Sequence, residues 1–221
     1  MTNFVQQYRD TNQSSWPTLN GTAGSLIALL DAILVNGGTT QSVTGITESG
    51  TTYTATIGSD ATLLSGTYIT ISGGSPAGVN VTAPITVVSP TSFTFQGPGS
   101  LGTITGTILY KRASLGWTKP YTGTNLAAFL PQSVSGMPQF YLRIDETGGT
   151  AGGQKECAVR GYETMTDVSN GTGLFPTAAQ DTNGLCWRKS TTADSTARGW
   201  NLFGDGSTFY LVMNSDNSGT L

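Results

Sequence analysis

The side chains of this sequence that come nearest to a reactive pattern are two adjacent carboxylates, Asp145 and Glu146, and the glycine-rich run after them. Neighbouring residues at the end of a strand point to opposite faces, so this pair cannot flank one glycosidic bond. A phosphate-binding loop needs Lys and then Ser or Thr after its last glycine, whereas Gln154-Lys155-Glu156 follows here. We therefore expect that Asp145 and Glu146 begin a solvated hairpin loop that continues over residues 147–154.

A second pair of carboxylates, Glu163 and Asp167, would lie close together if the chain turns between them. A calcium site is the less favoured reading, because calcium needs more oxygen ligands in a fixed loop and no EF-hand or nonapeptide repeat is present. We expect instead that Thr164, Thr166 and Asp167 form hydrogen bonds with the backbone that shape a turn.

Histidine is absent from all 221 residues. The sequence therefore lacks the base that usually activates a serine or cysteine nucleophile, and it lacks the commonest metal ligand. Cys157 and Cys186 have no Cys-x-x-Cys spacing, and we expect each to be a small buried side chain rather than half of a disulfide or a metal ligand. We predict no enzyme activity, no catalytic residue, no metal and no cofactor.

Basic side chains are missing between Arg9 and Lys111. A stretch of this length without a cation cannot hold phosphate, so we predict no nucleic-acid partner. Charged residues make up only 10% of the chain, and hydroxyl and amide side chains take their place. So little charge gives poor protection against self-association, which indicates a subunit of a symmetric homo-oligomeric assembly.

A helix is predicted near the N-terminus, where apolar residues recur at spacings of three and four from Leu26 to Leu34. Thr22 or Ser25 can cap its start, and Asn36-Gly37-Gly38 can end it. A helix this short must dock, either within its own domain or on another subunit. The candidate assembly interface consists of Leu26, Ile27, Leu30, Ile33, Leu34 and Trp16, although packing within the domain is the commoner outcome.

The first twenty residues are polar with scattered aromatic side chains, and we expect an extended arm. Such an arm lies across a neighbouring subunit, or it is a strand or loop of its own domain that Trp16 holds in place.

Residues 41–110 alternate hydroxyl with apolar side chains, which is the period of β-strands. Runs rich in Gly, Ser and Pro separate them and supply turns. A density of about six short strands in this segment predicts a small β-sandwich or barrel. The expected strands are Val43–Thr47, Thr52–Ile57, Thr67–Ser72, Ile85–Val88, Ser92–Gln96 and Thr103–Tyr110.

Ordinary charge usage resumes at Lys111-Arg112. We therefore predict that residues 41–110 are a domain inserted into a host domain made of residues 1–40 and 111–221. Further strands are expected in the host at 139–145, 156–162 and 208–213, with loops at 147–154 and 169–177 and a hairpin turn at 204–206. Residues 214–221 are expected to fray, or the polypeptide continues beyond them.

The predicted fold class is mainly β, with a sandwich or barrel host domain, one short N-terminal helix and the inserted small sandwich. Aromatic residues of the host suggest another site, because rings on a β-domain can stack on sugars. Core or interface packing is their commoner role. The candidate ligand surface consists of Trp117, Tyr121, Trp187 and Trp200, with Tyr210 as a further member.

The segment from Leu64 to Gly73, followed by that from Ile85 to Phe95, resembles the Ig-like β-domains that occur as inserts in structural proteins of tailed bacteriophages. Segments 24–37, 116–125 and 160–167 resemble a family of phage virion proteins that has no assigned mechanism. The resemblance implies a head- or tail-attached accessory or decoration protein of the virion, with other virion proteins as partners. It carries over no catalytic residue.

The N-terminus lacks a secretory signal, and the longest apolar run, Leu26 to Val35, contains Asp31 and is too short to span a bilayer. We therefore expect synthesis in the cytoplasm of a bacterial host, location in the virion and no membrane partner. The alternative function is an adhesin module of the phage tail that binds polysaccharide on the host surface.

Overall fold

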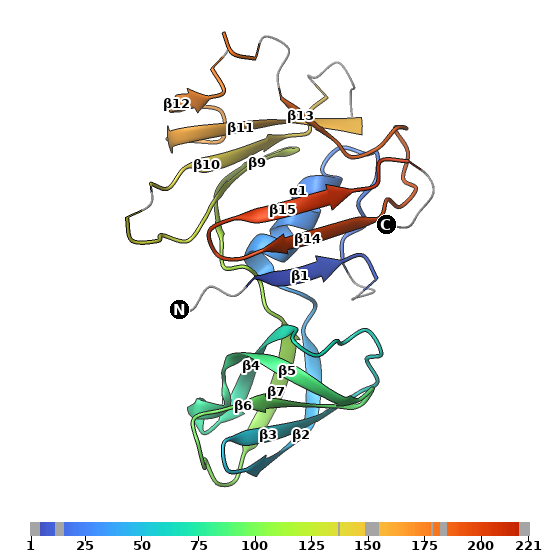
Figure 1. Cartoon of the computed structure of the whole chain (residues 1–221), viewed down its shortest axis with the longest axis vertical. Coiled ribbons are helices and arrows are strands. Elements are labelled where there is room, and N and C mark those ends of the chain that lie inside the picture. Colours follow the sequence, from blue (N-terminus) through green and yellow to red (C-terminus); the bar gives the residue numbers. More distant parts are fainter. Residues whose placement is uncertain are drawn as a thin grey trace. The chain divides into compact units, whose positions relative to one another are not determined.

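The structure is a computed structural model of the 221-residue chain. It describes residues 5–11, 16–136, 138–148, 155–177, 179–181 and 185–216. The chain is mainly β, with 47% of residues in strands and 8% in helices, so the predicted fold class is confirmed. Two compact units are present (Figure 1): the larger unit comprises Met1–Asp10, Pro17–Asn36 and Ser114–Leu221, and the barrel unit comprises Thr11–Trp16 and Gly37–Ala113.

The barrel unit contains a closed barrel of six antiparallel strands in the order β2-β3-β6-β5-β4-β7. All six strands predicted in this segment are present. They form a closed barrel, one of the two forms that the strand density left open, rather than the inserted small sandwich named in the predicted fold class. Closure removes the unpaired edges of the sheet. The strands are β2 (Gln41–Ser49), β3 (Thr52–Ile57), β4 (Tyr68–Ser75), β5 (Thr82–Ser89), β6 (Ser92–Gln96) and β7 (Thr105–Arg112), with the short helix η2 (Ala77–Val79) between β4 and β5.

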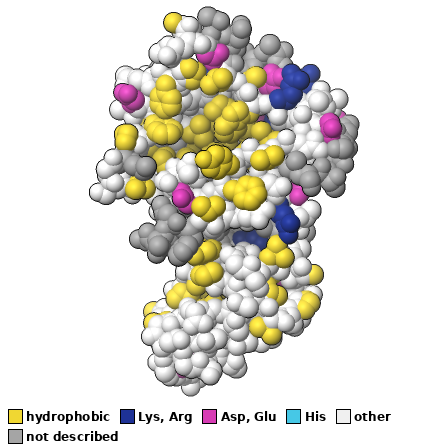
Figure 2. Space-filling view, in the orientation of Figure 1, with side chains coloured by type: hydrophobic (Ala, Val, Ile, Leu, Met, Phe, Trp, Pro, Cys, Tyr) yellow, Lys and Arg dark blue, Asp and Glu magenta, His cyan; other side chains and the backbone are white. Residues whose placement is uncertain are grey.

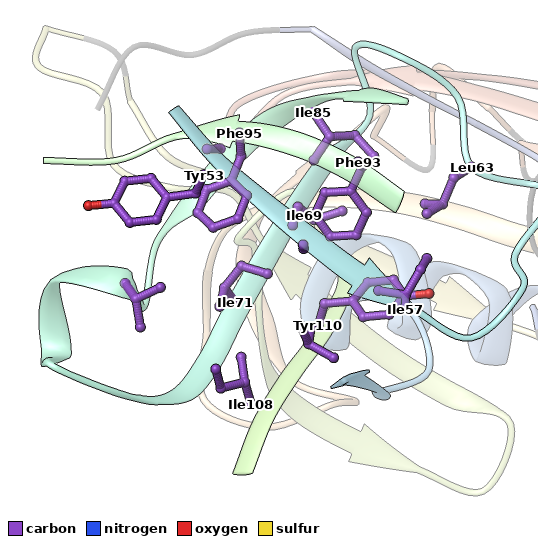
Figure 3. Close-up of a cluster of buried hydrophobic side chains, with 14 residues drawn as sticks. Tyr53, Ile57, Leu63, Ile69, Ile71, Ile85, Phe93, Phe95, Ile108 and Tyr110 are labelled. Atoms are coloured by element: carbon purple, nitrogen blue, oxygen red, sulfur yellow. The ribbon is translucent and has the colours of Figure 1, made fainter. Parts of the chain in front are cut away.

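The barrel is filled by the inward side of each alternating strand (Figure 3). On β3, Tyr53, Ala55 and Ile57 are buried, while the residues between them are more exposed. The rings of Phe93 and Tyr110 meet edge to face in the interior, with their centroids 5.5 Å apart. The period-two pattern in the sequence therefore reflects one buried face per strand.

The larger unit contains two β-sheets (Figure 1). The small sheet has the order β1-β14-β15, with β1 (Gln6–Arg9), β14 (Trp200–Gly204) and β15 (Phe209–Met213). The large sheet has the order β12-β11-β10-β9-β8, and a short strand, β13, pairs with β11 beside β12. Its strands are β8 (Thr118–Gly123), β9 (Leu126–Leu130), β10 (Tyr141–Asp145), β11 (Glu156–Met165), β12 (Gly171–Phe175) and β13 (Cys186–Arg188).

The host strands predicted near 139–145, 156–162 and 208–213 are present as β10, β11 and β15, and the predicted turn joins β14 to β15. The loop predicted at 169–177 is wrong, because β12 occupies most of it and pairs with β11. Strand β12 is short and rich in glycine, and it lacks the alternation of polar and apolar residues that predicts a strand. Residues 149–154 and 217–221, which belong to the predicted loop and the predicted frayed end, lie outside the described residues.

Within the predicted N-terminal arm, Gln6–Arg9 is a strand of the larger unit, because β1 pairs with β14 and brings Tyr8 opposite Leu202. The prediction that the arm lies across a neighbouring subunit is therefore wrong for residues 6–9. The side chain of Tyr8 is buried.

The predicted helix is present as α1 (Ser25–Leu30), which continues as one turn of π-helix, η1 (Asp31–Asn36). Gly37, with φ of 76°, ends it as expected. A cap by Thr22 or Ser25 is wrong, because α1 has no capping hydrogen bond from the side chain that precedes it. The hydroxyls of both residues donate to Asn20 instead. In the described part of the chain, no helix is long and apolar enough to cross a membrane.

Candidate interaction surface

The residues predicted as an assembly interface lie inside the molecule. Leu26, Leu30, Ile33 and Leu34 are 0% exposed, Trp16 is buried and Ile27 is half-buried. Other segments of the same chain cover the apolar face of the helix. The amide of Leu115 donates to the carbonyl of Ile33, and that of Trp117 donates to the carbonyl of Leu34. The predicted interface is therefore wrong, and the helix belongs to the core of the larger unit.

Glu146, expected in a solvated loop, is completely buried. Its carboxylate accepts hydrogen bonds from the backbone N–H groups of Leu26 and Ile27 at the start of α1. It also forms an ion pair with Lys189, whose side chain is equally buried. As expected of adjacent residues, Asp145 points the other way and binds Thr147 and Arg143 near the surface.

The Lys189 ammonium has three donors, and they go to Glu146, the hydroxyl of Ser25 and the carbonyl of Thr22. No donor remains for a substrate. This buried cluster therefore joins the start of α1 to two distant segments of the chain and has no exposed reactive atom. Lys189 was not singled out in the sequence, because nothing in its neighbours marks a buried ammonium.

The turn expected around Asp167 is confirmed. Oδ1 of Asp167 accepts hydrogen bonds from the amides of Ser169 and Asn170, and these bonds lower the pKa of the carboxyl together with one from the Asn170 side chain, which contributes most. The hydroxyl of Thr164 instead forms a hydrogen bond with that of Thr172, 2.7 Å away across the β11–β12 pair. Among the described residues no cluster of three or more His, Cys, Asp or Glu side chains is placed to hold a metal ion.

Cys157 and Cys186 are both free thiols. Cys157 is buried as expected, and burial raises its pKa to about 12. Cys186 is exposed, so the expectation of a buried side chain is wrong for it. The strand pairing explains the difference. Cys157 lies opposite Trp187 and Cys186 lies opposite Ala158, so the two thiols are on opposite faces of the large sheet.

The predicted aromatic surface does not form. Trp117 and Trp200 are 5% and 1% exposed, so neither offers a ring face to a sugar. Tyr121 is half-buried and its hydroxyl donates to the carbonyl of Met165. Trp187 is half-buried against Phe209, on a different part of the unit.

Apolar side chains are instead exposed on the outer face of the small sheet. Phe203, Tyr210 and Val212 are 37%, 74% and 49% exposed, and Phe203 lies directly opposite Tyr210. Their neighbours in the strands, Trp200 and Leu202, point inward and are buried. We call Phe203, Tyr210 and Val212 the outer patch.

A second group of exposed apolar side chains lies on the large sheet, on the face that carries the buried Ile144. Phe140 and Phe175 contact each other edge to face at 5.2 Å, and each remains about 40% exposed. Leu185 is more exposed still. Figure 2 shows hydrophobic side chains gathered over β9, β10 and β15, without Lys or Arg among them in this view.

The two sheets meet at Phe209 of β15, whose ring contacts those of Trp117 and Trp187. Both groups of exposed apolar side chains therefore belong to the larger unit. Comparison with known protein families, with curated proteins and with solved structures found no match.

Proposed function

We propose that this chain is a structural component of a tailed bacteriophage particle, head- or tail-attached, that acts through protein–protein contacts. The observation that carries the proposal is the exposed apolar surface of the larger unit, in particular the outer patch. Exposed aromatic and aliphatic side chains that form a contiguous surface are typical of protein interaction sites. The phage assignment rests on the sequence resemblance of the insert and its flanking segments to virion proteins.

The buried polar and thiol side chains of the described residues also favour a structural role. The buried Lys189 and Glu146 have hydrogen-bond partners within the chain and offer no atom to a substrate. The buried Cys157 thiol has its pKa raised to about 12 by desolvation, so it is a poor nucleophile at neutral pH. The surface that remains is suited to contact rather than to chemistry.

Purified particles of the encoding phage provide the test. Mass spectrometry should find the chain in them, and Tyr210→Lys should exclude it, because a charge at the centre of the outer patch would be buried without a partner. Val88→Lys is the matched control, since Val88 is 63% exposed on β5 of the barrel unit. Absence of the unaltered chain from particles, or equal incorporation of both variants, would contradict the proposal.

A further inference from the structure

β15 is an edge strand, and its free side can be identified from the hydrogen bonds of the hairpin. The amide of Asp205 donates to the carbonyl of Thr208, and that of Asn214 donates to Gly199. Because bonded pairs alternate along antiparallel strands, Tyr210 and Val212 bond to β14. The backbone groups of Phe209, Leu211 and Met213 therefore point away from the sheet, and no hydrogen bond to them is recorded within the described chain.

The side chains of the same three residues are half-buried and lie on the inner side of the small sheet, which they share with the buried Trp200 and Leu202. Phe209 contacts Trp187, with ring centroids 6.3 Å apart. Trp187 lies opposite Cys157 in the large sheet, and Phe175 lies opposite Gly161. Cys157 and Gly161 are on one face of β11, because they are four positions apart and side chains alternate between the faces of a strand. The free edge of β15 therefore borders the face on which Phe175 remains exposed.

We call this place the slot: it consists of the free edge of β15 and of the face of the large sheet that carries Trp187, Phe175 and Leu142, which we call its floor. Strand β15 itself contains no charged residue. At its far end the slot is closed, because the amide of Thr191 donates to the carbonyl of Ser215 at 2.6 Å. The open edge from Phe209 to Met213 is about 17 Å long at the usual rise of a strand.

We propose that the slot binds one extended, uncharged segment of another polypeptide, which adds to the small sheet as a fourth strand beside β15. The inference rests on the proposed structural function and names the chemistry of the partner. Main-chain groups of the segment pair with those of Phe209, Leu211 and Met213, while alternate side chains cover the apolar floor. Those between them lie on the outer side of the sheet beside Tyr210, so the floor requires apolar residues of the segment only at every second position.

A second copy of this chain fits the slot less well than a single strand. Two copies joined through β15 would be related by a two-fold axis perpendicular to the sheet, which leaves both large sheets on the same side of it. Each large sheet already borders its own β15, since Trp187 contacts Phe209. The two would therefore compete for the space next to the axis.

The experiment uses the full chain and a blocked peptide of about seven residues in which threonine and valine alternate. Binding should be saturable, and hydrogen exchange measured by NMR should slow at the amides of Phe209, Leu211 and Met213. Leu211→Pro removes an outward N–H without removing a bond to β14, and it should weaken binding at least about tenfold. Gln7→Pro is the matched control, because its N–H points away from β14 on the opposite edge.

Several outcomes would overturn the inference: no saturable binding, equal binding by the unaltered chain and Leu211→Pro, protection at β1 instead of β15, or a dimer that Leu211→Pro dissociates. The exchange measurement on the unaltered chain needs no variant, so it decides even if Leu211→Pro fails to fold. If the peptide does not bind but Tyr210→Lys still excludes the chain from particles, the inference fails and the proposed function stands. If the peptide binds but the chain is absent from particles, the proposed function fails alone.

Discussion

The ammonium of Lys189 and the carboxylate of Glu146 form an ion pair in which both side chains are 0% exposed. Glu146 also accepts the amides of Leu26 and Ile27, so it takes the place of the side-chain cap that α1 lacks. The pair therefore satisfies backbone donors as well as two charges. Its residues come from separate segments, and each would be an unpaired buried charge without the other.

Removal of either partner should strongly destabilise the larger unit. Lys189→Met leaves a buried carboxylate, and Glu146→Gln leaves a buried ammonium, so we expect each to lower the free energy of unfolding by about 3–5 kcal/mol. The double variant should lose less than the sum, because neither charge then remains. Denaturant unfolding of the four proteins measures this. Glu163→Gln, at an exposed carboxylate, should change stability by less than about 0.5 kcal/mol, and additive losses in the double variant would contradict the pairing.

The two thiols should differ sharply in reactivity. Iodoacetamide at pH 8 should modify Cys186, which is exposed, and should leave Cys157 unmodified until the protein unfolds. Burial raises the pKa of Cys157 to about 12, so very little thiolate is present at pH 8, and burial also keeps the reagent from reaching the sulfur. The pKa of Cys186 is also raised, first by desolvation and then by the carboxylate of Glu156, so its reaction should be slow. Peptide mass spectrometry assigns the label, and labelling of Cys157 in folded Cys186→Ser would contradict this order.

The sequence predicted strands where apolar and polar residues alternate, as on β3, where Tyr53, Ala55 and Ile57 point into the barrel. It did not predict β8 or β9, and on β9 three consecutive residues are buried, so that strand has no alternation. It also did not predict β12 or β13. Gly171–Phe175 and Cys186–Arg188 are too short to show a clear alternation of apolar and polar residues, and they form strands because they pair with β11. Strand formation there depends on a distant partner, which no local pattern records.

The interaction surface was predicted on the wrong elements for a related reason. An apolar helix face has the same pattern whether its own chain or another subunit covers it, and here Leu30 and Ile33 are covered internally. Glu146 was placed in solvent because a carboxylate is buried only where a partner arrives. That partner, Lys189, lies 43 residues further along the chain.

Residues 37–113 should fold as an isolated fragment, because the barrel closes on itself and encloses its own core. We expect cooperative thermal unfolding and dispersed amide resonances. Within the fragment, Phe93→Ala should cost about 3–5 kcal/mol, since Phe93 is fully buried against Tyr110. Val88→Ala, at an exposed position of β5, should cost little. A fragment that melts without cooperativity would show that the barrel depends on the rest of the chain.

The Asp167 carboxyl should titrate below the ordinary value of about 3.9. Hydrogen bonds from the Asn170 side chain and the Ser169 amide favour the charged form and lower its pKa. Because the folded pKa is the lower one, the contribution to stability is present above the ordinary pKa and is lost as pH falls through the folded value. Carboxyl-carbon NMR measures the midpoint. Asn170→Ala should raise it toward the ordinary value, and an unchanged midpoint would contradict this cause.

Phe175 covers Gly161 so closely that a side chain at position 161 should reshape the floor of the slot. A Cβ built on Gly161 would lie 2.1 Å from two atoms of the Phe175 ring. Gly161→Ala should therefore displace the ring and lower stability by about 1–3 kcal/mol, the usual cost of overpacking. Phe175→Ala removes the obstacle, so adding Gly161→Ala to it should cost much less than in the unaltered chain. Denaturant unfolding of the four proteins tests this coupling. The same displacement should change the affinity of the slot for the alternating peptide, and strictly additive effects on stability would show that the ring does not rest on Gly161 in solution.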